Sequence, residues 1–186
     1  MVKNIINKSD YAEIVPAFSR KDKQFYTLNI NPQEVDGDMY VVLSHTYDHY
    51  PTQEDKDNLY ADYLALCKKV KLAEVERYDK SEDVNGFYLA GQHAWLDKAT
   101  RVGLANSITI EKAAGKEQTT LYLNGVALTL PLEQAQQMLA VLELYALDCY
   151  RKTEEHKIAV HNLTDIVQAE NYDCTQGYPE KIHFSL

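Results

Sequence analysis

The sequence predicts an α+β domain, because two strand-turn-strand patterns alternate with strongly periodic helices in the second half of the chain. Alternation of apolar and polar residues around a short turn indicates a hairpin, whereas apolar residues at three- and four-residue spacings indicate a helix. Each hairpin then pairs its strands antiparallel. We divide the chain into a small β-rich module (1–50), a long linking helix (51–80) and a hairpin-helix-hairpin-helix domain (81–186).

The first fifty residues have the least regular pattern. Residues 24–30 alternate as in a strand, and residues 39–43 form a more continuous apolar run that also suits a strand. Between them, the Asn-Pro pair at 31–32 and the Asp-Gly-Asp triplet at 36–38 have turn chemistry, because proline fixes φ and glycine accepts a positive φ. These signals predict a small hairpin module at the front of the chain.

Pro51, Thr52 and Asp55 predict the start of the linking helix. A threonine side chain can accept from the exposed N–H groups of the first turn, and an acidic residue suits the positive end of the helix. We expect the helix to run to about residue 79. Its apolar side is predicted from residues at alternating spacings of four and three, widened by three neighbours: Leu59, Tyr63, Leu66, Val70 and Ala73, then Tyr60, Leu64 and Cys67.

Two segments predict the hairpins of the last domain. Residues 87–96 alternate around a turn at 90–92, and residues 119–130 alternate around Asn124-Gly125, which suits the positive φ values of a type I′ turn. The second hairpin is the clearest local signal in the chain.

The helices of this domain are predicted from their caps. Asp97 is placed to cap a helix that Gly115 ends in the left-handed conformation. Pro131 suits the first position of the next helix, which we expect to end near residue 150. Thr153 and Thr164 are each placed to cap a shorter helix after it.

Composition and charge exclude several classes of protein. The 186 residues, 45% hydrophobic and 25% charged, suit one folded domain or a domain with an appendage. With 19 basic against 28 acidic side chains the net charge is −9, which repels phosphate backbones, so we do not expect a nucleic-acid partner. No stretch is apolar for long enough to span a bilayer, and the first residues lack the apolar run of a signal peptide. We expect a cytoplasmic protein without a membrane partner.

No sequence motif of an enzyme is present. A nucleotide-binding P-loop needs its Gly-Lys pair to open a helix, whereas Gly115-Lys116 closes one. No serine lies in a Gly-x-Ser-x-Gly elbow, and the spacing of Cys67, Cys149 and Cys174 fits neither a disulfide framework nor a metal hook. We therefore expect no cofactor, and the absence of motifs favours a protein without catalytic activity.

The densest candidate site is the segment 45–50. Its His45, Asp48 and His49 offer two imidazoles and a carboxylate, which suit zinc or another divalent metal. On a strand the two histidines share one face and Asp48 lies on the other, so the third ligand is missing. A surface loop before Pro51 explains the same residues without a metal and is favoured, with a small metal-binding enzyme as the alternative.

Tyr88, Trp95 and Tyr122 are candidates for a binding face on the hairpins. If the side of the first hairpin that carries Phe87 and Leu89 packs on the helices, Tyr88 points away from them, and exposed aromatic rings are typical anchors for a receptor or a carbohydrate. The favoured interpretation is that helices cover both sheet faces and bury the rings, because large aromatic side chains are more often buried than displayed.

Five runs of sequence stand out between about residue 78 and the end, at residues 78–81, 95–104, 110–115, 142–150 and 177–181. Together they resemble a domain of unknown function found in phage and prophage proteins. Proteins with that domain are often associated with tail fibres or their assembly, so the resemblance implies a bacterial host cell, or the virion, and a protein partner such as a tail component. It implies no reaction and no catalytic residues. The apolar sides of the two long helices leave a homo-oligomer as an open alternative.

Overall fold

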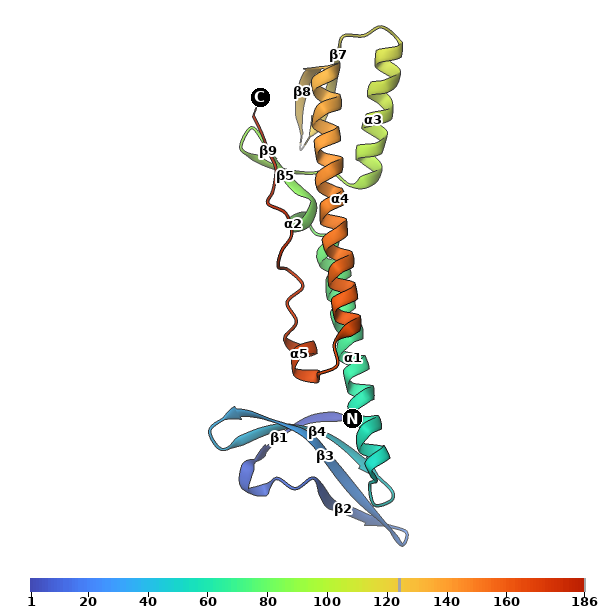
Figure 1. Ribbon diagram of the computed structural model, residues 1–186, viewed down its shortest axis with the longest axis vertical. Coiled ribbons are helices and arrows are strands. Elements are labelled where there is room, and N and C mark those ends of the chain that lie inside the picture. The colour runs from blue at the N-terminus through green and yellow to red at the C-terminus, as the bar shows by residue number, and fades with distance from the viewer. Residues whose placement is uncertain (124, 186) are drawn as a thin grey trace. The chain divides into compact units, whose positions relative to one another are not determined.

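The computed structural model describes residues 1–123 and 125–185 and has an α+β fold, with antiparallel sheets and five helices in that part of the chain (Figure 1). The chain divides into two compact units, one of residues 1–69 and 164–170 and one of residues 70–163 and 171–186. The elements in chain order are β1 (Val2–Asn7), a 3₁₀ turn (Lys8–Asp10), β2 (Ile14–Arg20), β3 (Lys23–Asp36), β4 (Met39–Tyr47), α1 (Gln53–Asp79), α2 (Glu82–Asn85), β5 (Gly86–Leu89), β6 (Gln92–Trp95), α3 (Lys98–Ala113), β7 (Gln118–Leu123), β8 (Val126–Pro131), α4 (Leu132–Asn162), α5 (Ile166–Asn171) and β9 (His183–Phe184).

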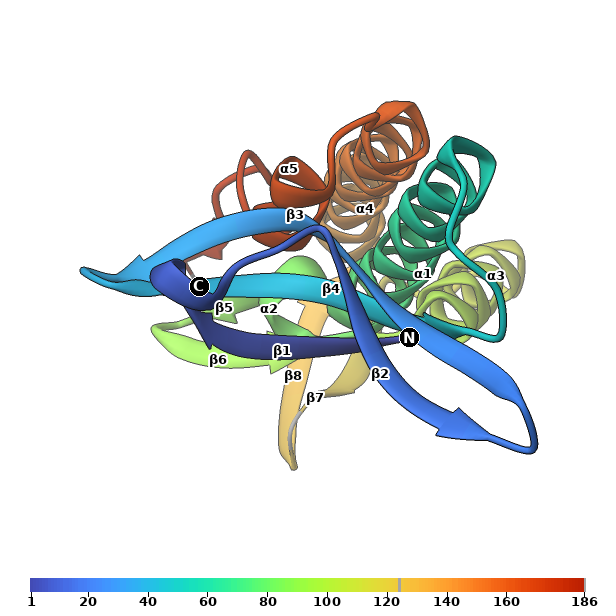
Figure 2. The ribbon, with the colours of Figure 1, turned by 90° about the horizontal axis from the view of Figure 1, so that it is seen from below.

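The first unit is built on a four-stranded antiparallel sheet with the strand order β1-β4-β3-β2 (Figure 2). One face buries Leu28 and Ile30 of β3 and Leu43 of β4 against Leu59 of α1 and Ile166 of α5. Period-two alternation along β3 and helical periodicity in α1 supply the two sides of this core. The sheet is therefore completed by a helix that is distant in the sequence.

Two features of this sheet differ from the sequence-based expectation. The strands β1 and β2 were not predicted, because nearly all their side chains are exposed or half-buried and give no core-facing alternation. The predicted turn at 31–32 is wrong: β3 continues through it, with a register shift between Ile30 and Gln33 and a positive φ of 52° at Asn31. The Asn-Pro signal marks a bulge within a strand instead of its end. The turn at 36–38 is confirmed, since β4 begins at Met39.

Helix α1 has the predicted length and buries part of the predicted apolar side. Of the eight residues of that side, Leu59 and Cys67 are buried and Tyr60, Tyr63 and Leu64 are half-buried. Leu66, Val70 and Ala73 are exposed, so their expected burial is wrong. Helical periodicity therefore predicted the covered side in the first half of the helix, but not how far along the helix that side is covered.

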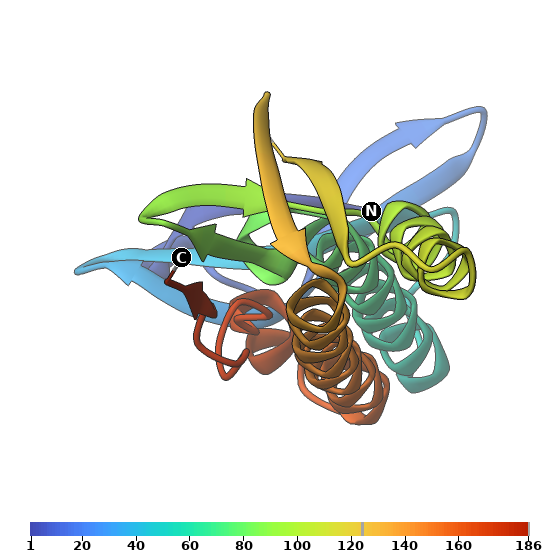
Figure 3. The same cartoon turned by 90° about the horizontal axis from the view of Figure 1, so that it is seen from above.

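The second unit is organised along the 31-residue helix α4. Figures 1 and 3 show α3 on one side of the first part of α4 and the β7–β8 hairpin on another. The largest core of this unit joins both hairpins to both helices and includes Phe87, Ile108, Leu121 and Leu142. On β7, Thr119, Leu121 and Leu123 are buried while the residues between them are exposed, as predicted for a hairpin strand.

The caps of α3 follow the sequence, while those of the later helices differ. Asp97 accepts a hydrogen bond from Thr100 N at 2.8 Å, and Gly115 has a φ of 78°. Pro131 lies one residue earlier than expected, as the N-cap of α4 and the last residue of β8. For the predicted turn at Asn124-Gly125, Asn124 lies outside the described residues, and Gly125 has a positive φ of 78°.

The predicted helix start at Thr153 is wrong, because α4 continues to Asn162 without a break. The Thr153 hydroxyl is buried inside the helix, where it donates to the Cys149 carbonyl or to Asp79 and contacts the Tyr178 hydroxyl at 2.9 Å. A mid-helix threonine can satisfy its hydroxyl in this way, so it need not cap anything. Before α5, Asp165 and not Thr164 accepts from the backbone, through Gln168 N at 2.9 Å.

A histidine fastens the C-terminal segment to α4. The buried ring of His156 lies between the carbonyl of Gln176, 2.9 Å from Nε2, and the hydroxyl of Tyr172, 2.7 Å from Nδ1. A carbonyl oxygen can only accept a hydrogen bond, so Nε2 of His156 carries the proton that is donated to Gln176. In the neutral ring Nδ1 has no proton, and it accepts the hydrogen bond from the Tyr172 hydroxyl. Beyond this point β9 pairs with β5 in parallel, which adds a non-hairpin strand to the two predicted hairpins.

None of the helices in the described residues combines the length and the apolar content that a membrane crossing requires.

Two leucines of α4 test the core. Leu142 is 2% exposed and Leu144 is 64% exposed, so both substitutions to alanine change helix propensity equally and only one opens a cavity. We expect Leu142→Ala to lower the free energy of unfolding by about 2–5 kcal/mol in urea denaturation, and Leu144→Ala to change it by less than about 0.5 kcal/mol. Equal losses in the two variants would contradict the assignment of the buried side.

Candidate functional site

The structure separates the three aromatic residues that the sequence singled out. Tyr88 on β5 and Trp95 on β6 share the face of this hairpin opposite the buried Phe87, as the strand register requires. Tyr88 is half-buried, because its ring stacks on His183 of β9 at 4.5 Å. Tyr122 is 76% exposed but belongs to the separate β7–β8 sheet. The three rings therefore do not form one binding face.

Trp95 lines a groove of about 570 Å³ in the second unit. The tryptophan is 37% exposed, and Leu147 and Tyr150 from the outward side of α4 extend the apolar surface beside it. The other lining residues come from α4 itself, from the end of α1, from α2 and from the junction of β6 and α3. The groove thus combines large apolar side chains with charged side chains. All of them lie on helices or strands, or directly next to their ends.

An ion pair joins the two helices that border this groove, which we call the Trp95 groove. The side chain of Arg101 on α3 is only 9% exposed, and its Nε donates to Glu143 Oε2 on α4 at 2.9 Å. The Arg101 guanidinium also donates to the Leu96 carbonyl at 2.7 Å. The Glu143 side chain is 52% exposed, so solvent screens the ion pair, which connects the β6–α3 junction to α4 with a modest contribution to stability.

Two more carboxylates of the Trp95 groove are engaged in local structure. Asp97 accepts from the backbone N–H and the hydroxyl of Thr100, at 2.8 and 2.7 Å. These hydrogen bonds lower the pKa of Asp97 below its ordinary value. Asp79 accepts from the Thr153 hydroxyl at 2.7 Å. The carboxylates of Asp79 and Asp97 therefore both take part in hydrogen bonds that stabilise the fold.

The chemistry of the Trp95 groove suits binding. No serine, threonine, cysteine or histidine is among its described lining residues. Within residues 1–123 and 125–185, no group of three or more His, Cys, Asp or Glu is arranged to hold a metal ion. Tryptophan, tyrosine and arginine, which all line the groove, are residue types enriched at protein interfaces.

A second pocket, of about 490 Å³, lies between α4, β8 and the end of the chain. Its lining includes the apolar residues Leu128, Leu130, Met138 and Phe184, and no charged side chain is among its described lining residues. Without charged groups this pocket gives no indication of what would occupy it, so the Trp95 groove is the better candidate.

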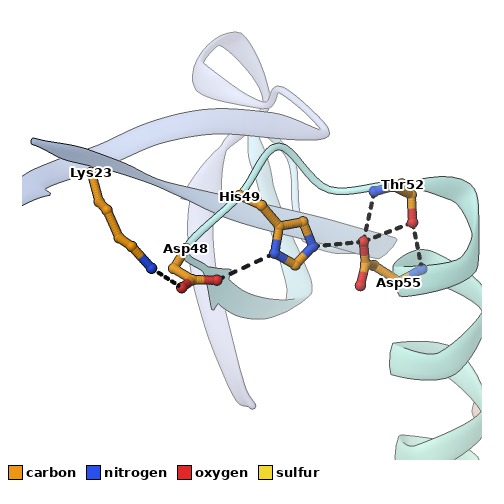
Figure 4. A network of polar contacts seen from close by, with 5 residues as sticks. All are labelled: Lys23, Asp48, His49, Thr52 and Asp55. Atoms are coloured by element: carbon orange, nitrogen blue, oxygen red, sulfur yellow. Dashed lines mark hydrogen bonds and ion pairs between the residues drawn. The ribbon is translucent and has the colours of Figure 1, made fainter.

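The histidines proposed as metal ligands lie in the first unit, and only one belongs to a polar network (Figure 4). His49 places Nδ1 at 3.3 Å from Asp48 and Nε2 at 3.1 Å from Asp55. His45 lies on β4 with its ring 4.7 Å from that of Tyr47. The structure thus uses His49 to connect the end of β4 with the start of α1, and His45 stays outside that network.

Thr52 and Asp55 cap α1 in both directions, as the sequence predicted. Asp55 N donates to the Thr52 hydroxyl at 3.2 Å, and Thr52 N donates to Asp55 Oδ2 at 2.8 Å. Hydrogen bonds from the Thr52 backbone and side chain, then from His49, lower the pKa of Asp55 to about 2. The same contacts with Asp55 and Asp48 raise the pKa of His49 above 6.5.

Comparison of the chain with protein-family models, with curated proteins and with solved structures finds no match. The evidence for a functional site therefore comes from the geometry of the chain itself.

Sequence reasoning found Trp95 but not the rest of the Trp95 groove. Leu147 and Tyr150 lie on the side of α4 away from its buried positions, so they were an available signal: apolar residues off the buried stripe of an amphipathic helix. The pairing of Arg101 with Glu143 left no sequence signal, because the two residues are 42 positions apart on different helices.

The His49 network predicts a pH-dependent contribution to stability. A raised folded pKa means that the contribution is complete below the unfolded value of 6.5 and is lost as the pH rises through the folded value. We expect His49→Gln to destabilise the protein more at about pH 5.5 than at about pH 9, measured by urea denaturation at both values.

The control for this measurement is His45→Gln, four residues earlier on β4, whose histidine has no carboxylate partner in the described part of the chain. A destabilisation by His49→Gln that is the same at both pH values would contradict the role of the charged imidazole.

Proposed function

We propose that this protein is a non-enzymatic accessory protein of a phage or prophage, which binds a segment of a partner protein in the Trp95 groove during assembly of the tail or tail fibre. The observation that carries the proposal is the exposure of Trp95, Leu147 and Tyr150 side by side in one groove. Exposed aromatic clusters on rigid elements are typical of sites that bind other proteins.

The phage context rests on the sequence resemblance. Three of the runs that carry the resemblance, 78–81, 95–104 and 142–150, contribute every described lining residue of the Trp95 groove except Asn85. The groove and the resemblance therefore draw on the same residues, which supports a binding role within that context.

Self-association is a second candidate for the partner, favoured by the outward side of α4. Leu144 and Ile158 are exposed there and are not part of the Trp95 groove. A second copy of the chain covering this side would make the protein a homo-oligomer. No comparable observation favours the metal-binding enzyme, since His49 faces two carboxylates and His45 lies apart from it.

The test measures binding of the purified protein to the tail and tail-fibre proteins encoded by the same phage or prophage. We expect Trp95→Ala with Leu147→Ala to weaken binding at least tenfold, because aromatic anchors at interfaces contribute about 2 kcal/mol or more. Biolayer interferometry would measure the affinities.

The matched control is Tyr122→Ala, which removes a more exposed ring from a different sheet and should leave the affinity unchanged. Light scattering after size exclusion would separate a homo-oligomer from a complex with another protein. Absence of binding to every tail protein, or equal binding by the groove variant and the wild type, would refute the proposal.

A further inference from the structure

The two edges of the four-stranded sheet in the first unit differ in how they are protected. The strand order β1-β4-β3-β2 places β1 and β2 at the edges, where part of the backbone N–H and C=O groups point away from the sheet. In β2, Pro16 carries no N–H, and the register with β3 shifts between Pro16 and Phe18. A proline and a bulge are two of the devices by which natural proteins block further pairing at a sheet edge. The edge at β2 is therefore protected.

Strand β1 has neither of these devices. It pairs with β4 from Val2 to Asn7 without a register shift, and it contains no proline. Its one charged residue is Lys3, whose ammonium group forms an ion pair with Glu170 of α5 and lies 5.7 Å from the ring centroid of Tyr63. The lysine is thus drawn toward the helices of the same unit. Strand β1 therefore offers an uninterrupted edge to another strand.

Ile5 gives this edge an apolar surface. Lys3 pairs with Leu43 of the core, and Ile5 lies two residues further along β1, so both are on the side of the sheet that α1 and α5 cover. Even so, Ile5 is 65% exposed, because the core side of the sheet extends past the helices at this edge. An exposed apolar residue beside unpaired backbone groups favours pairing with another strand.

We propose that β1 is a dimerisation strand, which pairs antiparallel with β1 of a second copy of the chain about a two-fold axis at Ile5. In this register Ile5 lies opposite Ile5 of the second copy, and Lys3 lies opposite Asn7, so no lysine faces another. The two four-stranded sheets become one sheet of eight strands, and the open edges at β1 disappear. The inference goes beyond the proposed function, because it concerns the first unit and not the Trp95 groove.

Charge favours a second copy as the occupant of this edge. Glu170 compensates the charge of Lys3, so β1 has little to attract a strongly acidic or basic strand. A neutral strand with an apolar centre fits better, and β1 is itself such a strand once Lys3 is paired. At physiological salt, charges more than about 8 Å apart are largely screened, so the net charge of −9 on each copy does not prevent the pairing.

The expected dimer is weak. One strand of six residues from each copy buries less surface than the roughly 1,200 Å² of a stable protein interface, so we expect a dissociation constant on the order of 10 μM. Sedimentation velocity of the full-length protein at concentrations from about 1 to about 100 μM would cover the transition from monomer to dimer.

The variant Ile5→Lys tests the edge by charge. It places two ammonium groups opposite each other at the two-fold axis, and like charges that meet at an interface are unfavourable, so we expect the dissociation constant to rise at least tenfold. The matched control is Phe18→Lys, which adds the same charge at an exposed apolar position of β2 and should change the constant by less than about twofold. Circular dichroism would verify that both variants are folded.

The variant Ile5→Cys tests the register. Opposite residues of antiparallel strands have Cα atoms about 4.5–5.5 Å apart, which is within the range of a disulfide bond. The three native cysteines are all buried. Oxidation with copper phenanthroline should therefore link two copies of Ile5→Cys and leave the wild type and Phe18→Cys as single chains on a non-reducing gel.

Three results would overturn the inference. They are a wild-type chain that stays monomeric over the whole concentration range, a dimer that Ile5→Lys leaves intact, and cross-linking through Phe18→Cys that equals cross-linking through Ile5→Cys. None of them bears on the proposed function, because the binding of a tail protein is tested by variants of the Trp95 groove in the second unit.

Discussion

The second unit depends on the burial of one side of helix α4. The first part of that side covers the hairpin core through Leu132, Leu139 and Leu142. One turn further on, Tyr145 and Cys149 both reach the Val84 carbonyl of α2, at 2.8 and 3.1 Å. Burial raises the pKa of the Cys149 thiol to about 11, so this sulfur is a structural donor and not a reactive thiolate.

The opposite side of α4 is available for function because the buried side satisfies the fold. Glu143 pairs with Arg101 beside the buried side of α4, and Leu147 and Tyr150 are exposed next to Glu143 in the Trp95 groove. The core and the groove therefore use neighbouring strips of the surface of one helix. In this way a helix that is stabilised by its buried side also presents apolar residues outside the core.

Sequence patterns predicted the elements whose signals are local. The hairpins at β5–β6 and β7–β8, the cap at Asp97 and the start of α1 at Thr52 all follow from residues a few positions apart. Contacts between distant residues were not accessible in this way. The parallel pairing of β9 with β5 and the continuation of α4 past Thr153 depend on tertiary contacts, and so does the length over which the apolar side of α1 is covered. For the candidate site, the sequence provided Trp95 as a candidate binding residue, although burial of its ring was the favoured interpretation, and its neighbours come together only in the folded chain.

Both units are discontinuous in the sequence, and this constrains how the chain is made. The first unit takes residues 164–170, including Ile166 of its core, and the second takes residues 171–186, including the strand β9. On the ribosome, the four-stranded sheet therefore waits with part of its apolar face uncovered until more than 160 residues have been synthesised. Strand β5 likewise keeps an open edge during that time. Exposed edges and apolar faces of nascent chains favour aggregation, so residues 164–186 have a protective role in biosynthesis as well as a structural one.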